Sequence, residues 1–243
     1  MPAFNFNWRE MKTIGLIGGM SWESTALYYK LMNQEVSRRL GGLHSTQLLL
    51  HSLDFAPVAQ AQHDGDWETA AEILRDSAQR LAAAGAHALV LCTNTMHKLA
   101  PEIERSCALP LLHIADSTAR AAKDLGCRKV GLLATAFTMR ESFLKDRLAA
   151  SFDLDVMVPA REAQEDIHRI IYEELCKGVL RDDSRSRYQR AIDDLKARGA
   201  EAVILGCTEI TLLIQDVHSS LPLLDSTALH AQSAVDFALA GEL

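Results

Sequence analysis

Short apolar runs alternate along this chain with longer segments in which apolar residues recur at helical spacing. The short runs predict strands and the longer amphipathic segments predict helices, because side chains repeat with different periods in the two structures. The predicted strands cover residues 12–17, 47–53, 88–91, 111–114, 129–134, 155–158 and 202–205, and a last short strand begins at Leu223. The predicted helices cover residues 22–40, 67–84, 95–105, 117–125, 139–150, 166–177, 184–198 and 228–240.

Strands that alternate with helices indicate an α/β fold, in which helices cover the faces of parallel sheets. Part of this pattern occurs twice. The segment 85–91, GAHALVL, matches the segment 199–205, GAEAVIL, which lies 114 positions later. Two further pairs occur in the same order: 12–16 with 128–132, and 116–119 with 225–228. The internal repeat predicts two pseudo-symmetric lobes, each a parallel sheet flanked by helices, with an active-site cleft between them.

The repeat also predicts where the two lobes begin and end. We assign residues 12–115 with 220–243 to the first α/β lobe, and residues 116–219 to the second. Residues 1–11 precede the first predicted strand, and we interpret them as an extension or an alternative start. No low-complexity linker separates the two halves of the chain.

Composition and charge exclude several classes of protein. The 243 residues are 48% hydrophobic and 23% charged, values typical of a globular chain that buries a sizeable core. The formal net charge of -7 argues against a nucleic-acid binder, which needs a basic face. No apolar run approaches the roughly 20 residues of a membrane span, and the N-terminus lacks the pattern of a secretory signal. We therefore expect a cytoplasmic protein with neither a membrane nor a nucleic-acid partner.

Five cysteines are spread widely along the chain, without a Cys-x-x-Cys pair or the spacing of zinc ligands. Such a pattern is typical of reduced thiols that are buried as small hydrophobic residues. We adopt this interpretation for Cys107, Cys127 and Cys176. Cys92 and Cys207 need separate treatment, because each lies at the end of a predicted strand.

The repeat shows which residues correspond at these two strand ends. At the spacing of 114 residues, Cys92 matches Gly206, and the residue that matches Cys207 is Thr93. We therefore expect Cys92 to be a buried strand-end residue. Thr93 is expected to face Cys207 across the pseudo-twofold axis.

Four motifs together resemble the aspartate/glutamate racemase family: IGLIGGMSWEST, LCTNTMHK, IIYEEL and LGCTEI. The resemblance covers nearly the whole chain from Lys12 onward. The usual family member has a cysteine in both paired motifs, whereas this chain has Thr93-Asn94-Thr95 in the first and Cys207 in the second. This combination is similar to the branch of L-aspartate/glutamate-specific or broad-specificity amino-acid racemases, in which threonine faces cysteine.

The resemblance implies a cofactor-independent amino-acid racemase that interconverts L- and D-amino acids by 1,1-proton transfer at Cα, and a homodimer. Cys207 then takes the α-proton of the L-amino acid, and Thr93, alone or with water, protonates the other face. A threonine hydroxyl ionises far above neutral pH, so the two faces are expected to differ in α-hydrogen exchange with solvent. We expect backbone N–H groups at a helix start beside Cys207 to favour its thiolate.

The candidate substrate-binding residues are polar or lie in tight turns near the predicted strand ends, except Gln62, which matches a binding glutamine of the family branch. They are Met20, Ser21, Gln62, Asn94, Thr95 and Thr208. Asn94, Thr95 and Thr208 can donate hydrogen bonds to a carbanion-like intermediate. The turn GGMS allows close approach of backbone to a ligand, although a plain strand-to-helix turn has the same composition. Glu209 either orients the loop or ligand, or is an acidic residue at a helix start.

One position departs from the family pattern. Members often carry a basic residue before the IIYEEL segment, where it pairs with a substrate carboxylate, and here Asp166 stands at that place. An acid there would repel an aspartate or glutamate side chain and favour a broader substrate range. Arg161 and His168 are the candidates to replace the missing positive charge.

Other functions remain compatible with the sequence. An arylmalonate-decarboxylase-like enzyme shares the lobed fold and a single active-site cysteine, and a non-catalytic amino-acid-binding protein would keep the cleft. Solvent exchange at Cα distinguishes a racemase from both. A pyridoxal enzyme would need a Schiff-base lysine, and Lys98 has no accompanying phosphate loop. His44, His51, His97 and His113 lie near predicted strand ends without a metal motif, so no metal is expected.

Overall fold

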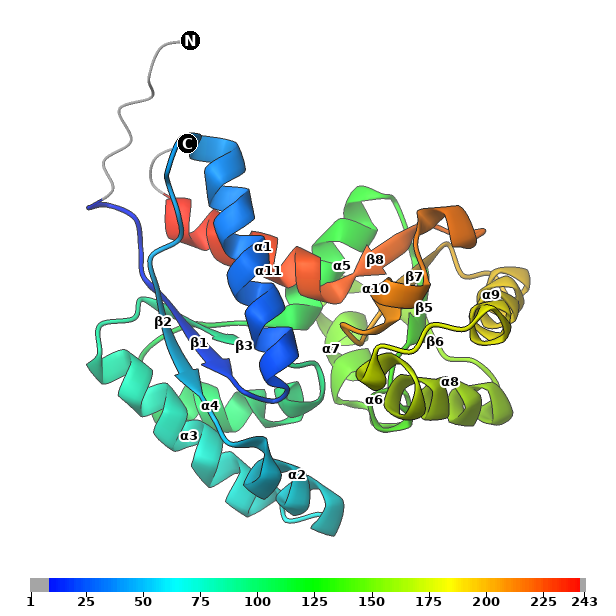
Figure 1. Cartoon of the computed structure of the whole chain (residues 1–243), viewed down its shortest axis with the longest axis horizontal. Helices are drawn as coiled ribbons and strands as arrows, with labels where there is room; N and C mark the ends of the chain where they lie inside the picture. The colour runs from blue at the N-terminus through cyan, green and yellow to red at the C-terminus, as the bar shows by residue number, and fades with distance from the viewer. Residues whose placement is uncertain (1–8, 241–243) are drawn as a thin grey trace. The chain divides into compact units, whose positions relative to one another are not determined.

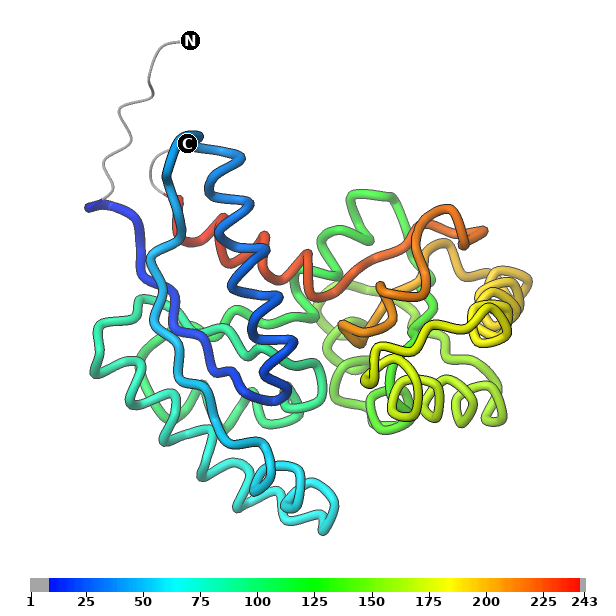
Figure 2. Tube along the Cα trace, viewed as in Figure 1, coloured from blue at the N-terminus to red at the C-terminus, as the bar shows by residue number. Residues whose placement is uncertain are grey.

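A computed structural model describes residues 9–240, which form two compact α/β units (Figure 1). Among the described residues, the first unit comprises 9–113 and 230–240, and the second comprises Ile114–Leu229. Each unit contains a four-stranded sheet whose neighbouring strands are all parallel. The expected α/β class with two parallel sheets is therefore confirmed. Along the trace in Figure 2, the chain leaves the first unit after His113 and re-enters it at His230.

The first sheet has the strand order β2-β1-β3-β4. Its strands are β1 (Ile14–Gly18), β2 (Leu48–Ser52), β3 (Ala88–Leu91) and β4 (Leu111–Leu112). Its helical segments are α1 (Trp22–Leu40), α2 (Phe55–Asp64), α3 (Trp67–Ala83), the 3₁₀ turn η1 (Thr95–Leu99), α4 (Ala100–Ser106) and most of α11 (Ser226–Leu239). In the register, Ile17 is the partner of both His51 and Leu91, so the three longer strands end at one edge of the sheet.

Side chains of the first sheet alternate between two separate hydrophobic cores. Leu16 and Val90 pack in the core that contains residues of α1 and α11. Ile17 and Leu91 pack in the core that contains residues of α2, α3 and α4. Because both faces are covered, the central strands β1 and β3 are fully buried and contain no polar side chain, which explains why they read as continuous apolar runs in the sequence.

The second sheet repeats this topology with the order β6-β5-β7-β8. Its strands are β5 (Lys129–Leu133), β6 (Asp155–Met157), β7 (Ala202–Leu205) and β8 (Leu223–Asp225). Its helical segments are α5 (Ile114–Asp124), α6 (Ala136–Arg140), α7 (Phe143–Phe152), α8 (Arg161–Glu173), η2 (Leu175–Lys177), α9 (Asp182–Ala197), α10 (Ile210–Leu213) and η3 (Asp216–His218). The buried apolar residues of this unit form one continuous core.

The boundary between the units differs from the one expected from the repeat. Strand β8 pairs in parallel with β7, so residues 220–229 lie with the second unit, and only the segment from His230 returns to the first. The physical reason is that β8 completes the second sheet as β4 completes the first.

The interpretation of residues 1–11 as an extension or an alternative start falls largely outside the described residues. Of these residues, the structure describes 9–11. Met11 is buried, and its sulfur accepts the N–H of Gln47 at 3.3 Å.

Helix α2 has no counterpart among the predicted elements. Asp54 accepts the N–H of Ala56 at its start, and Gly65 ends it in the left-handed conformation. Only Val58 and Ala61 of this helix are buried, so it carries too short an apolar stripe for the periodicity to reveal.

Within residues 9–240, no helix combines the length and the apolar composition that crossing a bilayer requires.

Candidate active site

The triplet Thr93-Asn94-Thr95 lies directly beyond the carboxyl end of β3. The N–H of Thr93 donates to the carbonyl of Leu91 at 2.8 Å, which turns the chain out of the strand. Thr93 and Thr95 are half-buried, whereas Asn94 is buried. Thr95 then begins η1. The triplet is therefore a short connection that presents two partly accessible hydroxyl groups at the end of a central strand.

The turn GGMS joins β1 to α1 at the same edge of the first sheet. β1 and β3 are neighbouring parallel strands, so the loops that follow them lie together, at the place where open α/β sheets bind ligands. The hydroxyl of Ser21 accepts the N–H of Ser24 at 3.3 Å, and Thr25 donates to the carbonyl of Ser21 at 2.9 Å. Met20 is buried. Met20 and Ser21 thus share one end of the sheet with Thr93.

A glycine is required at position 19 by the packing of the protein itself. Gly19 has a φ of 90° and donates its N–H to the hydroxyl of Thr25 at 2.8 Å. A Cβ at this position would lie 2.2 Å from the carbonyl oxygen and 2.5 Å from the nitrogen of Leu53. The close backbone approach is therefore made to another segment of the same unit, which favours the interpretation of GGMS as a tight structural turn.

Gln62 lies on α2, the helix that follows β2. β2 is the other neighbour of β1, so α2 begins near the edge where the GGMS turn lies. Gln62 is half-buried in the second half of this helix, away from the strand end. Its role in substrate binding stays a prediction.

Thr93 and Cys207 occupy equivalent positions in their own sheets. Strands β3 and β7 are each third in the strand order, and each ends two residues before its candidate residue. The N–H of Cys92 donates to the carbonyl of Ile17 at 3.0 Å, and the N–H of Gly206 donates to the corresponding strand β5 at 2.8 Å. The correspondence read from the repeat therefore holds for the backbone hydrogen bonds of both strand ends.

Cys207 belongs to the turn GCTE, residues 206–209, between β7 and α10. Its half-buried side chain donates a hydrogen bond from Sγ to Oε2 of Glu209 at 2.9 Å. The hydroxyl of Thr208 donates to the same carboxylate oxygen at 2.7 Å. The carbonyl of Cys207 accepts the N–H of Ile210 at 3.2 Å. The turn is thus organised around one carboxylate oxygen that two side-chain donors share.

The surroundings of Cys207 favour the thiol over the thiolate. Burial raises the pKa of Cys207 well above its ordinary value, and the charge of Glu209 raises this pKa further. The backbone N–H of Glu209 acts in the opposite direction but is outweighed. Helix α10 has only four residues and begins three positions after Cys207, so its dipole contributes little. The expected backbone contribution to the thiolate is therefore present, but burial and Glu209 outweigh it.

The loop after β5 lies beside the GCTE turn, because β5 and β7 are neighbouring strands. Thr135 caps α6 in this loop. The N–H of Ala136 donates to Nδ1 of His168 at 3.3 Å, and the His168 ring lies against Tyr172 with 4.8 Å between ring centroids. Tyr172 belongs to the IIYEEL motif, which is the signal in the sequence that could have revealed this group. Thr135 has no comparable signal.

Neither candidate replacement for the missing basic residue supplies an isolated positive charge. Burial and the nearby cation of Arg140 lower the pKa of His168, so His168 is neutral at neutral pH. Arg161 is largely exposed and lies 3.4 Å from the carboxylate of Glu165. His168 is therefore a neutral hydrogen-bonding group of the loop after β5.

Tyr188 of α9 is a further buried polar residue of the second unit. Its side chain is fully buried, and within residues 9–240 its hydroxyl has no hydrogen-bond partner. Burial raises the pKa of Tyr188 well above its ordinary value, and the negative charge that Cys207 carries as a thiolate would raise this pKa further. Tyr188 is thus coupled to the ionised form of Cys207, and its isolated position in the sequence gave no sign of this.

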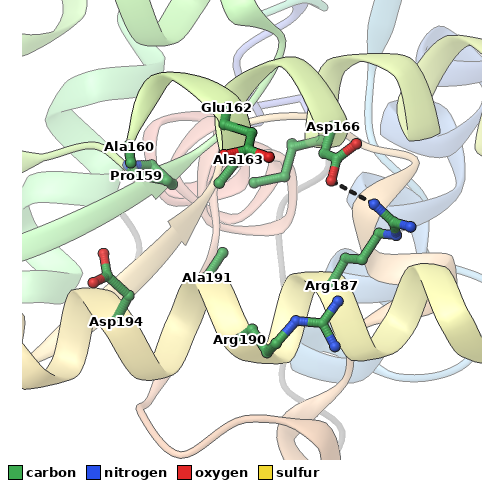
Figure 3. A pocket seen from close by; sticks show the side chains of 10 residues that line it. Pro159, Ala160, Glu162, Ala163, Asp166, Arg187, Arg190, Ala191 and Asp194 are labelled. Atoms are coloured by element: carbon green, nitrogen blue, oxygen red, sulfur yellow. Dashed lines mark hydrogen bonds and ion pairs between the residues drawn. The ribbon is translucent and has the colours of Figure 1, made fainter.

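Asp166 lies on α8 and faces α9 (Figure 3). Its Oδ2 accepts a hydrogen bond from Nη1 of Arg187 at 2.6 Å, and Nη2 of Arg169 lies 3.7 Å from Oδ1. Asp166 and Arg187 line an open pocket of about 360 Å³ between the two helices. Because two guanidinium groups neighbour this carboxylate, Asp166 is not the isolated negative charge on which the expected repulsion of acidic substrates rested.

The other candidate residues occupy structural positions. Cys92 is fully buried in the core of α1 and α11, as expected, and burial raises its pKa. Cys127 is also buried, but Cys176 is exposed in η2, so the expected burial of Cys176 is wrong. Lys98 places its ammonium group over the ring of Trp67, 4.1 Å from the centroid. Across residues 9–240, no three His, Cys, Asp or Glu side chains form a group able to hold a metal ion.

Relatives of known family match most of the chain. Residues 17–234 match the family model described as Asp/Glu/Hydantoin racemase. The broad specificity amino-acid racemase RacX of Bacillus subtilis is 22% identical over 238 residues, which cover 93% of this chain and 98% of that protein. The glutamate racemase of Ectopseudomonas mendocina is 31% identical over 200 residues, or 78% of this chain and 72% of that protein.

Solved structures resemble the whole chain. A candidate Asp/Glu racemase from Yersinia pestis is 51% identical with a TM-score of 0.91, covering 94% of this chain and 100% of that one. PH1733 of Pyrococcus horikoshii, described as an aspartate racemase homologue, is 34% identical with a TM-score of 0.83, covering 94% and 99%. The similarity therefore includes both units.

Proposed function

The chain belongs to the Asp/Glu/Hydantoin racemase family and is an isomerase, and we propose that it interconverts L- and D-amino acids by 1,1-proton transfer at Cα between Cys207 and the Thr93 side. The observation that supports this assignment most directly is that Cys207 and Thr93 occupy equivalent positions in the two sheets. Each follows the third strand of its sheet by two positions, and the strand ends before them make corresponding hydrogen bonds. Racemisation needs one group for each face of Cα, and a duplicated strand end supplies two.

The proton on Cys207 has a defined place in the proposed reaction. To accept the α-proton of an L-amino acid, Cys207 must first lose its own proton, and Glu209 at 2.9 Å is placed to accept it. This transfer moves one negative charge from Oε2 to Sγ, so no additional charge is buried. The Cα–H bond then breaks toward Sγ, and its electron pair is delocalised into the substrate carboxylate. In the opposite direction, the Cys207 thiol donates its proton to the intermediate, which agrees with its raised pKa.

Thr93 serves the second face, where a new Cα–H bond forms. A threonine hydroxyl is too weak an acid to act efficiently alone near neutral pH, so we propose that it relays a proton from water. The two faces then differ in how fast they exchange hydrogen with solvent. The equilibrium constant between free enantiomers is one, so kcat/KM is equal in both directions, and the asymmetry is visible only in the exchange.

Hydrogen-bond donors near both strand ends support the carbanion-like intermediate. Asn94 and Thr95 adjoin Thr93, and Thr208 adjoins Cys207, so each candidate acid–base residue has polar neighbours in its own turn. Donors aimed at the developing negative charge on the carboxylate lower the barrier more than they strengthen substrate binding. Met20, Ser21 and Gln62 complete the proposed binding set.

We propose that the substrates are free amino acids and include neutral ones. RacX, which matches along nearly its whole length, is named as a broad-specificity enzyme, whereas the Ectopseudomonas relative is named for glutamate. The pairing of Asp166 with Arg187 removes one argument against acidic substrates without favouring them. We further propose that the enzyme works without a cofactor, as a homodimer, in the cytoplasm.

The decisive experiment is proton NMR in D₂O with a panel of L- and D-amino acids. The wild-type protein is expected to remove the α-proton signal of its substrates. Cys207→Ala is expected to lower this rate by about 10²–10⁴-fold, the usual contribution of a positioned acid–base group. Cys92→Ala is the matched control, because Cys92 is a buried core residue, and it is expected to keep the wild-type rate.

The outcomes separate the proposed racemase from the alternatives. Exchange that depends on Cys207 but not on Cys92 supports the racemase, and the panel identifies its substrates. Absence of exchange with every amino acid contradicts it. Carbon dioxide release from an arylmalonate would then indicate the decarboxylase, and binding of an amino acid without exchange would indicate a binding protein.

A further inference from the structure

Three histidines of the first unit pack against one another in its interior. His97, His113 and His230 are 2%, 5% and 0% exposed. The ring centroids of His97 and His113 lie 4.4 Å apart, and those of His97 and His230 lie 5.6 Å apart. Burying polar rings is unfavourable unless each is hydrogen-bonded, so the partners of these rings indicate what the cluster holds in place.

The partner of His97 is the backbone of the candidate residue Thr93. Nδ1 of His97 lies 2.7 Å from the carbonyl oxygen of Thr93. A carbonyl can only accept a hydrogen bond, so Nδ1 must carry a proton, and this fixes the tautomer of the ring. The bond holds the peptide group between Thr93 and Asn94. His97 therefore controls the orientation of the backbone from which the Thr93 side chain projects.

The partners of His230 anchor the other side of the cluster. Nε2 of His230 lies 2.7 Å from the carbonyl oxygen of Leu112, so Nε2 is the donor. With Nε2 protonated, the neutral form of the ring would accept the hydroxyl of Tyr28 at Nδ1, and these two atoms lie 2.8 Å apart. Leu112 ends β4, the strand next to β3. The cluster is thus tied to β4, to the turn after β3 and to α1.

The histidines also mark both positions where the chain passes between its two units. His113 is the last residue of the first segment of the first unit, and His230 is the first residue of the segment that returns. Both rings lie against His97. The ring that holds the Thr93 carbonyl is therefore flanked by both chain crossings, although the three histidines are far apart in the sequence.

We propose that His97 is a positioning residue for Thr93, and that His113 and His230 hold the His97 ring, so that the chain crossings and the Thr93 turn form one assembly. This inference rests on the proposed role of Thr93. His97 touches no reacting atom and acts through the peptide group of Thr93. Its loss should therefore affect the face of Cα that Thr93 serves, and spare the face that Cys207 serves.

A pair of substitutions at position 97 tests the proposal. His97→Leu removes the hydrogen bond to the Thr93 carbonyl. His97→Asn retains a donor, because the amide nitrogen of the new side chain can take the place of Nδ1 and donate to the same carbonyl. Each variant is incubated in D₂O with an L-amino acid that the wild type racemises. Two rates are measured: deuteration at Cα by NMR, and formation of the D-enantiomer by chiral chromatography. Thr93→Ala provides the reference for loss of one face.

The expected result is a change in the ratio of the two rates. In His97→Leu, formation of the D-enantiomer should fall by about 10- to 100-fold, since small misplacements of a reacting group have effects of that size. Deuteration with retention of the L-configuration should persist, because it needs only Cys207. His97→Asn should restore most of the wild-type ratio. An equal decrease of both rates in His97→Leu, or no decrease, would overturn the positioning role.

A second measurement does not depend on the folding of any variant. Long-range ¹H–¹⁵N correlation spectra of the wild-type protein distinguish the two neutral tautomers of histidine. The signal assigned to His97 should show a protonated Nδ1, and that of His230 a protonated Nε2. A protonated Nε2 with a bare Nδ1 at His97 would overturn the proposal. If the wild type exchanged no α-proton at all, the proposed racemase would fail, whatever tautomer His97 showed.

Discussion

The thiol of Cys207 and the carboxylate of Glu209 are joined by a hydrogen bond of 2.9 Å within one four-residue turn. The hydroxyl of Thr208 donates to the same oxygen, so the carboxylate is held from two sides. Because Glu209 disfavours the thiolate and is also the nearest acceptor for the thiol proton, the acid–base states of the two side chains depend on each other. The pKa of Cys207 therefore depends on Glu209, two positions away, in addition to burial.

Glu209→Gln is expected to make Cys207 easier to ionise. The substitution removes the negative charge that raises the pKa of the thiol, while burial, the larger cause, remains. The pKa should fall partway toward its ordinary value, and alkylation of Cys207 by iodoacetamide at pH 8 should accelerate by about tenfold for each pKa unit. Mass spectrometry of the peptide that contains Cys207 measures the rate.

The matched control for this substitution is Glu173→Gln. Glu173 is an exposed acid on α8 of the same unit, and its removal should leave the alkylation rate of Cys207 unchanged. An unchanged rate in Glu209→Gln would contradict the electrostatic link. If Glu209 also accepts the thiol proton during the reaction, racemisation should slow in Glu209→Gln although the thiol becomes more reactive.

The buried thiol of Cys92 should make the protein less stable at alkaline pH. Burial raises its pKa in the folded state, whereas a thiol in the unfolded chain ionises near pH ~8.5. As the pH rises above that value, the unfolded state loses its proton first. The free energy of unfolding should then decrease by up to about 1.4 kcal/mol per pH unit for this group. The contribution is fully present below pH ~8.5.

Urea unfolding between pH 7 and 10 measures this effect. Cys92→Ala should reduce the slope of stability against pH by the contribution of one thiol. Cys176→Ala, which removes an exposed cysteine, should keep the wild-type slope. Equal slopes for Cys92→Ala and the wild type would show that Cys92 does not titrate differently in the two states.

The ion pair between Asp166 and Arg187 should contribute little to stability. Both side chains are about one-third exposed, 34% and 36%, so solvent screens their attraction. A double-mutant cycle with Asp166→Asn and Arg187→Gln should give a coupling free energy of about 0.2–1 kcal/mol. A coupling well above this range would mean that the pair is more strongly desolvated than its exposure indicates.

Gly19→Ala should be more destabilising than Gly65→Ala. Both glycines have positive φ, 90° and 73°, and this conformation alone costs an alanine roughly 1–2 kcal/mol. At Gly19 the added Cβ would also meet the backbone of Leu53, whereas at Gly65 it would meet nothing within 4 Å. Thermal unfolding should therefore show a clearly lower Tm for Gly19→Ala.

The comparison isolates steric contact from backbone conformation. A similar Tm for the two variants would indicate that the turn can move away from Leu53. The hydrogen bond of 3.0 Å from the Leu53 N–H to the Gly18 carbonyl argues against such movement, because it fixes the two segments together.

Much of the fold could be predicted from local patterns in the chain. Helix α1 and strands β3 and β7 have the predicted bounds, because each consists of a continuous periodic or apolar segment with clear ends. Helix α2 was missed, since only Val58 and Ala61 mark its buried side. The predicted helix 139–150 is divided into α6 and α7 at residues 141–142. The first miss occurs where a short helix buries few apolar residues, and the second where two short helices adjoin within one apolar segment.

The sequence could predict which positions form the candidate site, but not the burial and the charges that surround them. The repeat identified Thr93 as the counterpart of Cys207, and the hydrogen bonds of Cys92 and Gly206 agree with it. The raised pKa of Cys207 could not be predicted, because burial by the surrounding core decides it. The electrostatic coupling of Tyr188 to ionised Cys207 was equally hidden, since α9 is separate from the GCTE turn in the sequence.

The sequence by itself determined the order of strands and helices, the duplication of the α/β unit and the matching strand ends at Thr93 and Cys207. These properties depend on periodicity and spacing along the chain, which need no knowledge of distant contacts. The tertiary structure alone decided that β8 completes the second sheet, that Asp166 pairs with Arg187, and that His97 packs beside His113 and His230. Those outcomes depend on which residues, distant in the sequence, pack together in the interior. Burial then sets the strength of the electrostatic interactions and hydrogen bonds that these residues make.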